Sequence, residues 1–131
     1  MKDIAKLVNE YVFEKTTIQV MNDVFQTDNN FDFENEIEVV SMHEASDAGK
    51  EFVDGTRKVE QFFSYRARGK NAKAVRDTLD TILNLLDTEQ RIRLSDGLSV
   101  QCKAVALPHF IEAEDGQKTI YECTVSVQYI E

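Results

Sequence analysis

The sequence has 131 residues, 42% of them hydrophobic and 30% charged, which is typical of one globular domain covering residues 1–131. Its 24 acidic and 15 basic residues give a formal net charge of −9, which argues against a general nucleic-acid binder or a protein that docks on anionic membranes. No run approaches the roughly 20 apolar residues that span a bilayer, and no signal-peptide pattern follows Met1, so we expect a protein made in a cytoplasm.

The N-terminal part is predicted to hold a helix, an ambiguous segment and a strand. An apolar stripe at helical spacing predicts the helix, and its members are Ile4, Leu7, Val8, Tyr11 and Val12. Residues 16–25 are rich in β-branched side chains, and their pattern leaves strand and helix open. Residues 26–36 are polar and predict a loop, and residues 36–42 predict a strand with Ile37 and Val39 on one face.

The middle of the chain is predicted to form a long loop, a strand and a helix. Residues 43–55 contain two glycines and several acidic residues, which indicate a loop of a length that is often functional. Residues 57–66 predict a strand that places Val59, Gln61, Phe63 and Tyr65 on one face. Residues 71–87 give the clearest helical pattern, with Asn71 as N-cap and an apolar stripe of Ala72, Val75, Leu79, Ile82, Leu83 and Leu86.

The C-terminal part predicts a hairpin. A turn at residues 95–97 leads into a strand over 98–107, which we expect to end at Pro108 because proline has no amide proton to donate. A second turn at 114–116 leads into a half-exposed strand over 119–130, whose inward face is Tyr121, Cys123, Val125, Val127 and Tyr129. Because Cys102 and Cys123 fall out of register, we expect two reduced, half-buried thiols.

This order of elements predicts an α+β fold, namely a mostly antiparallel mixed sheet with two amphipathic helices packed on one face. Few patterns point to chemistry. His43 and His109 lie far apart in the sequence, without a nearby Cys or second His, unlike zinc ligands. The acidic stretch from Asp28 lacks the glycine and the glutamate of a calcium loop. We therefore expect no enzymatic activity, no cofactor and no metal.

One feature departs from the acidic background, a cluster of cations at Arg57, Lys58, Arg66, Arg68, Lys70 and Lys73. It has two interpretations. It is a solvated strand face, or it is a positive patch that meets the acidic residues 34–38 or 47–54 of a neighbouring copy. The second interpretation suits head-to-tail contacts, which can close into rings.

Taken together, the whole chain resembles the tail terminator (tail completion, or minor capsid) proteins of long-tailed bacteriophages and prophages. The resemblance rests on the N-terminal amphipathic helix, on the strand ending FFSYRARG at residues 62–69, and on the helix NAKAVRDTLDTILNLLD at 71–87. It extends to the element LSDGLSV at 94–100 and to the final hairpin ending TVSVQYIE at 124–131.

The resemblance implies a non-enzymatic structural protein of the virion. Such a protein caps the tail tube as a hexameric ring, ends tube polymerisation and joins the tail to the head connector. Its partners would be copies of itself, the tail tube protein and a connector protein, while DNA passes through an acidic channel without specific binding. The alternatives are another connector component (a stopper or adaptor), an enzyme, or a small regulatory binding module.

No motif in this sequence identifies which residues correspond to the ring contacts of the family. From composition alone we nominate exposed aromatic and cationic residues as interface candidates, and these are Phe31, Phe33, Phe52, Arg57, Arg66 and Arg68.

Overall fold

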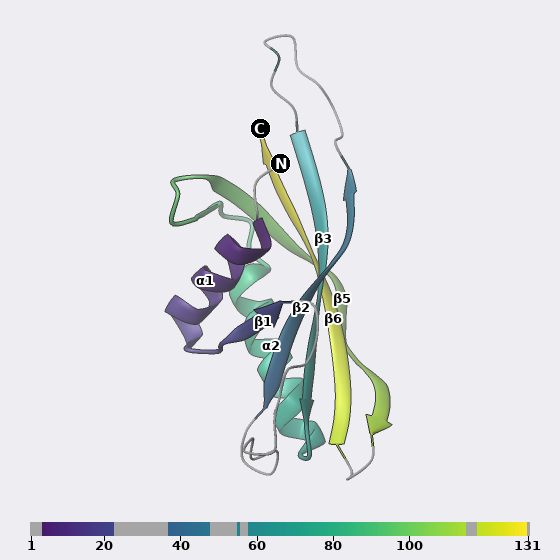
Figure 1. The fold of residues 1–131 in the computed structure, drawn as a ribbon. Coiled ribbons are helices and arrows are strands. Elements are labelled where there is room, and N and C mark those ends of the chain that lie inside the picture. The colour runs from purple at the N-terminus through teal and green to yellow at the C-terminus, as the bar shows by residue number, and fades with distance from the viewer. Residues whose placement is uncertain (1–3, 23–36, 48–54, 56–57, 115–117, 131) are drawn as a thin grey trace.

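The computed structural model describes residues 4–22, 37–47, 55, 58–114 and 118–130. Within these ranges the chain forms two helices and one sheet with the strand order β1-β2-β3-β6-β5-β4 (Figure 1). The elements are α1 (Ile4–Thr16), β1 (Val20–Asn22), β2 (Glu38–Asp47), β3 (Lys58–Gly69), α2 (Ala72–Leu86), β4 (Ile92–Arg93), β5 (Ser99–Glu114) and β6 (Lys118–Ile130). β1 runs parallel to β2 and the other neighbouring strands are antiparallel, which confirms the predicted α+β class.

The hydrophobic core lies between the two helices and one face of the sheet, which we call the helix face. The helical stripe of α2 is fully buried at Val75, Leu79, Ile82 and Leu86. It meets the inward side chains of the central strands, which are Val59, Phe63, Tyr65 and Ala67 of β3 and Cys123, Val125, Val127 and Tyr129 of β6. Burying each large apolar side chain contributes about 1.5–3 kcal/mol, so this layer supplies most of the driving force for folding.

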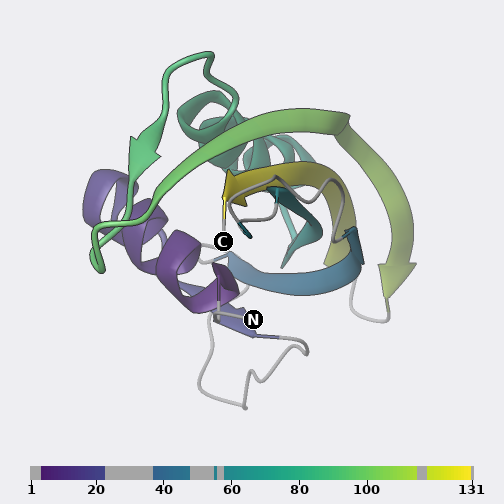
Figure 2. The ribbon, with the colours of Figure 1, turned by 90° about the horizontal axis from the view of Figure 1, so that it is seen from above.

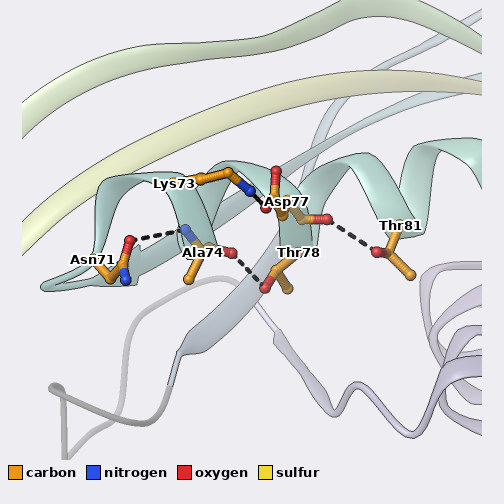
Figure 3. A network of polar contacts seen from close by, with 6 residues as sticks. All are labelled: Asn71, Lys73, Ala74, Asp77, Thr78 and Thr81. Carbon is orange, nitrogen blue, oxygen red and sulfur yellow. Dashed lines mark hydrogen bonds and ion pairs between the residues drawn. The ribbon is translucent and has the colours of Figure 1, made fainter.

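The first turn of α2 is capped as the sequence predicts. The side-chain oxygen of Asn71 accepts a hydrogen bond of 3.1 Å from the backbone N–H of Ala74 (Figure 3). Asn71 has an extended backbone, with φ −91° and ψ 103°, so the helix begins at the next residue. One of the otherwise unsatisfied amides of the helix terminus thereby gains a partner.

Replacing this cap should weaken the fold measurably. We expect Asn71→Ala to lower the free energy of unfolding by about 1 kcal/mol, because the Ala74 amide then loses its side-chain acceptor. Urea denaturation followed by circular dichroism measures the change. Asn71→Asp keeps an acceptor at the same position and should remain within about 0.5 kcal/mol of the wild type; an equal loss in both variants would contradict the capping role.

The ambiguous segment after α1 combines both predicted alternatives. Thr16 is the last residue of the helix, and Thr17 follows with a φ of 62° while its N–H bonds to the carbonyl oxygen of Phe13. That left-handed conformation ends the helix and turns the chain. Val20 then begins β1, which pairs with residues 39–41 of β2.

The predicted start of the loop over 43–55 is wrong, because the preceding strand continues into it. β2 continues through His43 to Asp47, and its pairing with β3 shifts register between His43 and Ala45. A β-bulge absorbs the extra residue, so the strand survives a stretch with little hydrophobic alternation. Most of residues 48–57 lie outside the described ranges.

The prediction that the strand over 98–107 ends at Pro108 is wrong. β5 continues past Pro108 to Glu114, with register shifts between Ala104 and Ala106, between Ala106 and His109, and between Phe110 and Glu112. The proline falls inside one of these irregularities, where no ladder hydrogen bond is lost. The shifts bend the strand, and Figure 2 shows β5 sweeping from the helices round to the far side of the sheet.

Candidate interaction surface

The six nominated interface residues fall into two groups. Phe31, Phe33, Phe52 and Arg57 lie outside the described residues. Arg66 and Arg68 lie on β3 and alternate with the core residues Tyr65 and Ala67, so both point to the face opposite the helix face, which we call the second face.

Both arginines on the second face pair with acidic residues of the same chain. Arg66 lies directly across from Glu122 of β6, and Nε of the arginine donates to a carboxylate oxygen of that residue. Arg68 lies directly across from Glu38 of β2 and donates to its carboxylate at 2.7 Å. Glu38 belongs to the acidic stretch that the sequence assigns to a contact with a neighbouring copy, yet here it neutralises a cation of its own chain.

The remaining described cations of the cluster are Lys58, at the start of β3, and Lys70 and Lys73, near the start of α2. Lys73 forms an ion pair of 2.7 Å with Asp77, one helical turn further on (Figure 3). Both side chains are largely exposed, so this pair stabilises the helix only slightly. Lys58 and Lys70 are exposed at opposite ends of β3. The cations therefore do not form one open positive patch across the described residues.

Further polar pairs cross the second face between neighbouring strands. Gln128 of β6 donates to Glu60 of β3 at 2.6 Å, and the hydroxyl groups of Ser64 and Thr124 lie 3.4 Å apart. The face is less open than the sequence suggests, because Ile120 and Ser126 of β6 are only 3% and 4% exposed. Cross-strand pairs of this kind fix the register of the central strands.

The two cysteines are free and buried. Cys102 lies opposite Val127 on β6, so no disulfide joins it to Cys123. Burial raises the pKa of each thiol to about 12, and for Cys123 the nearby Asp80 and Glu122 add to the effect. Burial raises the pKa of the neighbouring Tyr65 hydroxyl as well. None of these groups is ionised near neutral pH. The free thiols are confirmed, but both are fully buried rather than half-buried as the sequence predicts.

These thiols should make the fold less stable in alkaline solution. In the unfolded chain they ionise near pH 9, whereas in the folded chain they stay protonated until about pH 12. The unfolded state therefore loses protons first, and the free energy of unfolding falls between these pH values by up to about 1.4 kcal/mol per pH unit for each thiol. Urea denaturation at pH 8 and pH 10 measures this slope.

The matched control for this prediction is the double variant Cys102→Ala/Cys123→Ala. It is expected to start from a lower stability, because small cavities form, but to lose less stability between the two pH values. If the stability of the wild type and of the variant fell equally between pH 8 and pH 10, the buried thiols would not be the cause of the loss.

A surface that the sequence did not reveal lies on β5. Val105, Leu107 and Phe110 are 56%, 71% and 54% exposed, although all three are large and hydrophobic. They belong to residues 104–111, which contain no Asp, Glu, Lys or Arg, and which we call the β5 apolar segment. Phe110 leans edge-on against Tyr121 of β6, with 5.9 Å between ring centroids. Exposed apolar surface is a common feature of sites of protein contact, so this segment is a candidate interaction surface.

The outer edge of β5 is also open along most of its length. β4 pairs only with Ser99 and Val100, and within the described ranges no other strand pairs with that edge. The backbone N–H of Ala104 is satisfied instead by the carboxylate of Asp87, which follows α2, at 3.1 Å. In the sequence, the uncharged run at 104–111 was the one feature that could have predicted this surface. The prediction that the strand ends at Pro108 divided the run, so it was not recognised as one segment.

A hollow of about 360 Å³ lies between α1 and β1, and we call it the α1–β1 hollow. It is lined by Lys6, Asn9, Glu10, Phe13, Gln19 and Val20. Phe13 is 52% exposed at its rim, while Asn9 is buried and donates to the hydroxyl of Ser41 on β2 at 2.9 Å. That hydrogen bond joins α1 to the sheet and fixes one wall of the hollow.

The described residues hold no group of three or more His, Cys, Asp or Glu side chains placed to bind a metal ion. Neither α1 nor α2 is long and apolar enough to cross a membrane. A comparison of the sequence with known protein families finds no matching family, and a comparison with curated proteins finds no matching protein.

Proposed function

We propose that this protein is a structural component of a phage tail, which assembles with copies of itself into a hexameric ring that ends polymerisation of the tail tube. The ring would present its other side to a head connector protein. Three of the segments that carry the resemblance each fall on one element: FFSYRARG ends β3, NAKAVRDTLDTILNLLD covers α2, and TVSVQYI ends β6. This agreement in element order supports the proposal.

The observation that carries the proposal is the exposed β5 apolar segment. A protein with a net charge of −9 and 30% charged residues leaves eight consecutive strand residues without a formal charge, three of them large and exposed. Such a surface stabilises contacts with another protein, because burying it removes apolar area from water. The acidic net charge supports the proposal too, since a ring of such chains would repel DNA that passes through it.

Native mass spectrometry with and without the tail tube protein tests this function. We expect the protein to form six-fold complexes and to bind the tube protein in preference to the portal-side connector. Preferred binding to the portal side would instead identify a stopper or adaptor. Turnover of a small molecule, or tight binding to a basic regulatory partner without any ring, would contradict the proposal.

A further inference from the structure

Four basic residues gather at one corner of the second face. We call this group the basic corner, and its members are Lys58, Arg91, Arg93 and Lys103. On β3, Lys58 alternates with the buried Val59, and on β5, Lys103 alternates with the buried Cys102, so both point away from the helix face. Arg93 pairs with Ser99, which lies on the same face of β5 as Lys103. Arg91 comes two residues before Arg93 and joins the group at its edge.

A hollow of about 160 Å³ lies inside the basic corner, and we call it the Lys58–Arg91 hollow. Its described lining holds two cations, two amides and no carboxylate, and consists of Lys58, Arg91, Gln101, Gln128, Tyr129 and Ile130. Gln101 lies directly across from Gln128 on the neighbouring strand, so the two amides lie between the strands that carry the cations. The next residue in that row is Glu60, and Gln128 donates to its carboxylate at 2.6 Å. Cations and amides are the groups that donate to a bound carboxylate.

The basic corner is not neutralised within the described part of the chain. All four cations are exposed, and none of them forms an ion pair with a described carboxylate. Arg66 and Arg68 differ in this respect, because each pairs with a glutamate on a neighbouring strand of the same face. The corner is therefore a local positive field on a protein whose net charge is −9.

We propose that the basic corner binds a short acidic segment of a partner protein, with one carboxylate of that segment in the Lys58–Arg91 hollow. Lys58 and Arg91 pair with this carboxylate, and Gln101 supplies an amide donor beside them. Arg93 and Lys103 pair with further carboxylates of the same segment. The inference goes beyond the proposed function, because the site requires neither a ring nor a tail tube.

The spacing of the cations favours a segment with several carboxylates over a single free anion. Lys58 belongs to β3 and Arg93 to β4, which are three places apart in the strand order. Neighbouring strands lie about 4.8 Å apart, so the two residues start roughly 14 Å from each other. One phosphate or carboxylate group cannot contact both ends of the corner, whereas the side chains of a short acidic peptide can.

The charges around the corner favour a protein segment over nucleic acid. Glu60 borders the row of amides, and the net charge of −9 repels a polyanion that extends past the corner. Interactions between exposed charges reach only about 8 Å at physiological salt, so a short segment confined to the corner avoids most of that repulsion.

Fluorescence anisotropy with a labelled hexaglutamate peptide tests the inference on the intact protein. We expect the peptide to bind at about 50 mM salt and to be released at about 500 mM, while hexaglutamine does not bind. The double variant Lys58→Gln/Arg91→Gln should bind hexaglutamate about tenfold more weakly, because two charge pairs are lost. Both side chains are exposed, so the variant keeps its fold. Absence of binding at low salt, or equal binding by the double variant, would overturn the proposal.

The matched control is Lys15→Gln/Arg76→Gln, which removes the same charge from exposed positions on α1 and α2. It should bind hexaglutamate within about twofold of the wild type, because screening weakens the effect of distant charges. If it weakened binding as much as the double variant at the corner, the peptide would respond to net charge alone and the site would not exist.

Competition separates the sources of the bound anion. Unlabelled hexaglutamate should displace the labelled peptide at lower concentration than either hexathymidylate or inorganic phosphate. If hexathymidylate competes equally well, the corner binds nucleic acid, and if phosphate competes equally well, it binds free anions. Either result would overturn the proposal.

A second variant tests whether the hollow itself holds a carboxylate. Gln101→Glu places one there with almost no change in size, and it should weaken hexaglutamate binding at least about tenfold because it occupies the cations itself. Gln19→Glu is the matched control, since Gln19 is exposed and lies outside the corner. Equal binding by these two variants would show that no carboxylate of the peptide enters the hollow.

Discussion

Leu79→Ala is expected to lower the free energy of unfolding by about 2–5 kcal/mol, the largest loss from a single truncation that we predict. Leu79 is 0% exposed and lies at the middle of the buried stripe of α2, between Val75 and Ile82. Removing three carbon atoms loses their burial and leaves a cavity that rigid neighbours on the sheet cannot fill. Urea denaturation followed by circular dichroism at 222 nm measures the change.

Asn84→Ala is the matched control, because Asn84 is exposed on the same helix. This substitution should alter stability by no more than about 0.5 kcal/mol, and alanine's higher helix propensity favours a small gain. If both variants lost similar stability, the helix would not be anchored through its apolar stripe.

Arg68→Met is expected to lower the free energy of unfolding by about 3–5 kcal/mol, because it removes the guanidinium that pairs with the carboxylate of Glu38 in a nearly closed environment. The two side chains are only 12% and 5% exposed, so water can replace the lost partner only in part. The double variant Glu38→Leu/Arg68→Met removes both charges and should recover much of the loss. Chemical denaturation of the wild type, the two single variants and the double variant completes a double-mutant cycle.

The exposed pair on α2 provides the comparison for this cycle. Lys73→Met should change stability by less than about 1 kcal/mol, because Lys73 and Asp77 are 76% and 51% exposed and remain hydrated when separated. A cost at Arg68 as small as that at Lys73 would show that the pair on the second face is not shielded from water.

Sequence periodicity predicts the parts of this fold in which burial is one-sided and regular. The apolar residues of α2 keep helical spacing over its whole length, and those of β3 and β6 alternate as in a strand. The boundaries of these three elements differ from the predicted ones by at most three residues. The extension of β2 beyond Met42 and of β5 beyond Pro108 escapes prediction. Both depend on bulges, which change register and break the alternation that identifies a strand.

The candidate surface was less predictable, because it depends on which distant residues meet. Composition identified Arg66 and Arg68 as clustered cations, but only the register of β3 against β2 and β6 shows that Glu38 and Glu122 neutralise them. The α1–β1 hollow combines side chains from two elements with a left-handed turn at Thr17 between them. No local pattern encodes such a recess.

The exposed apolar surface changes which residues we propose for contacts with other proteins. The sequence directed attention to cations, whereas the described residues offer hydrophobic side chains on β5 and a recess beside α1. The ion pairs of the second face then stabilise the subunit itself.

The length of tail tubes grown in the presence of this protein tests the central claim most directly. Purified tube protein should polymerise to short tubes of uniform length when the protein is added early, with a ring visible at one end by electron microscopy, and Leu107→Glu should fail to stop growth. Tubes that grow equally long with and without the wild-type protein, and that carry no additional density at either end, would contradict the claim.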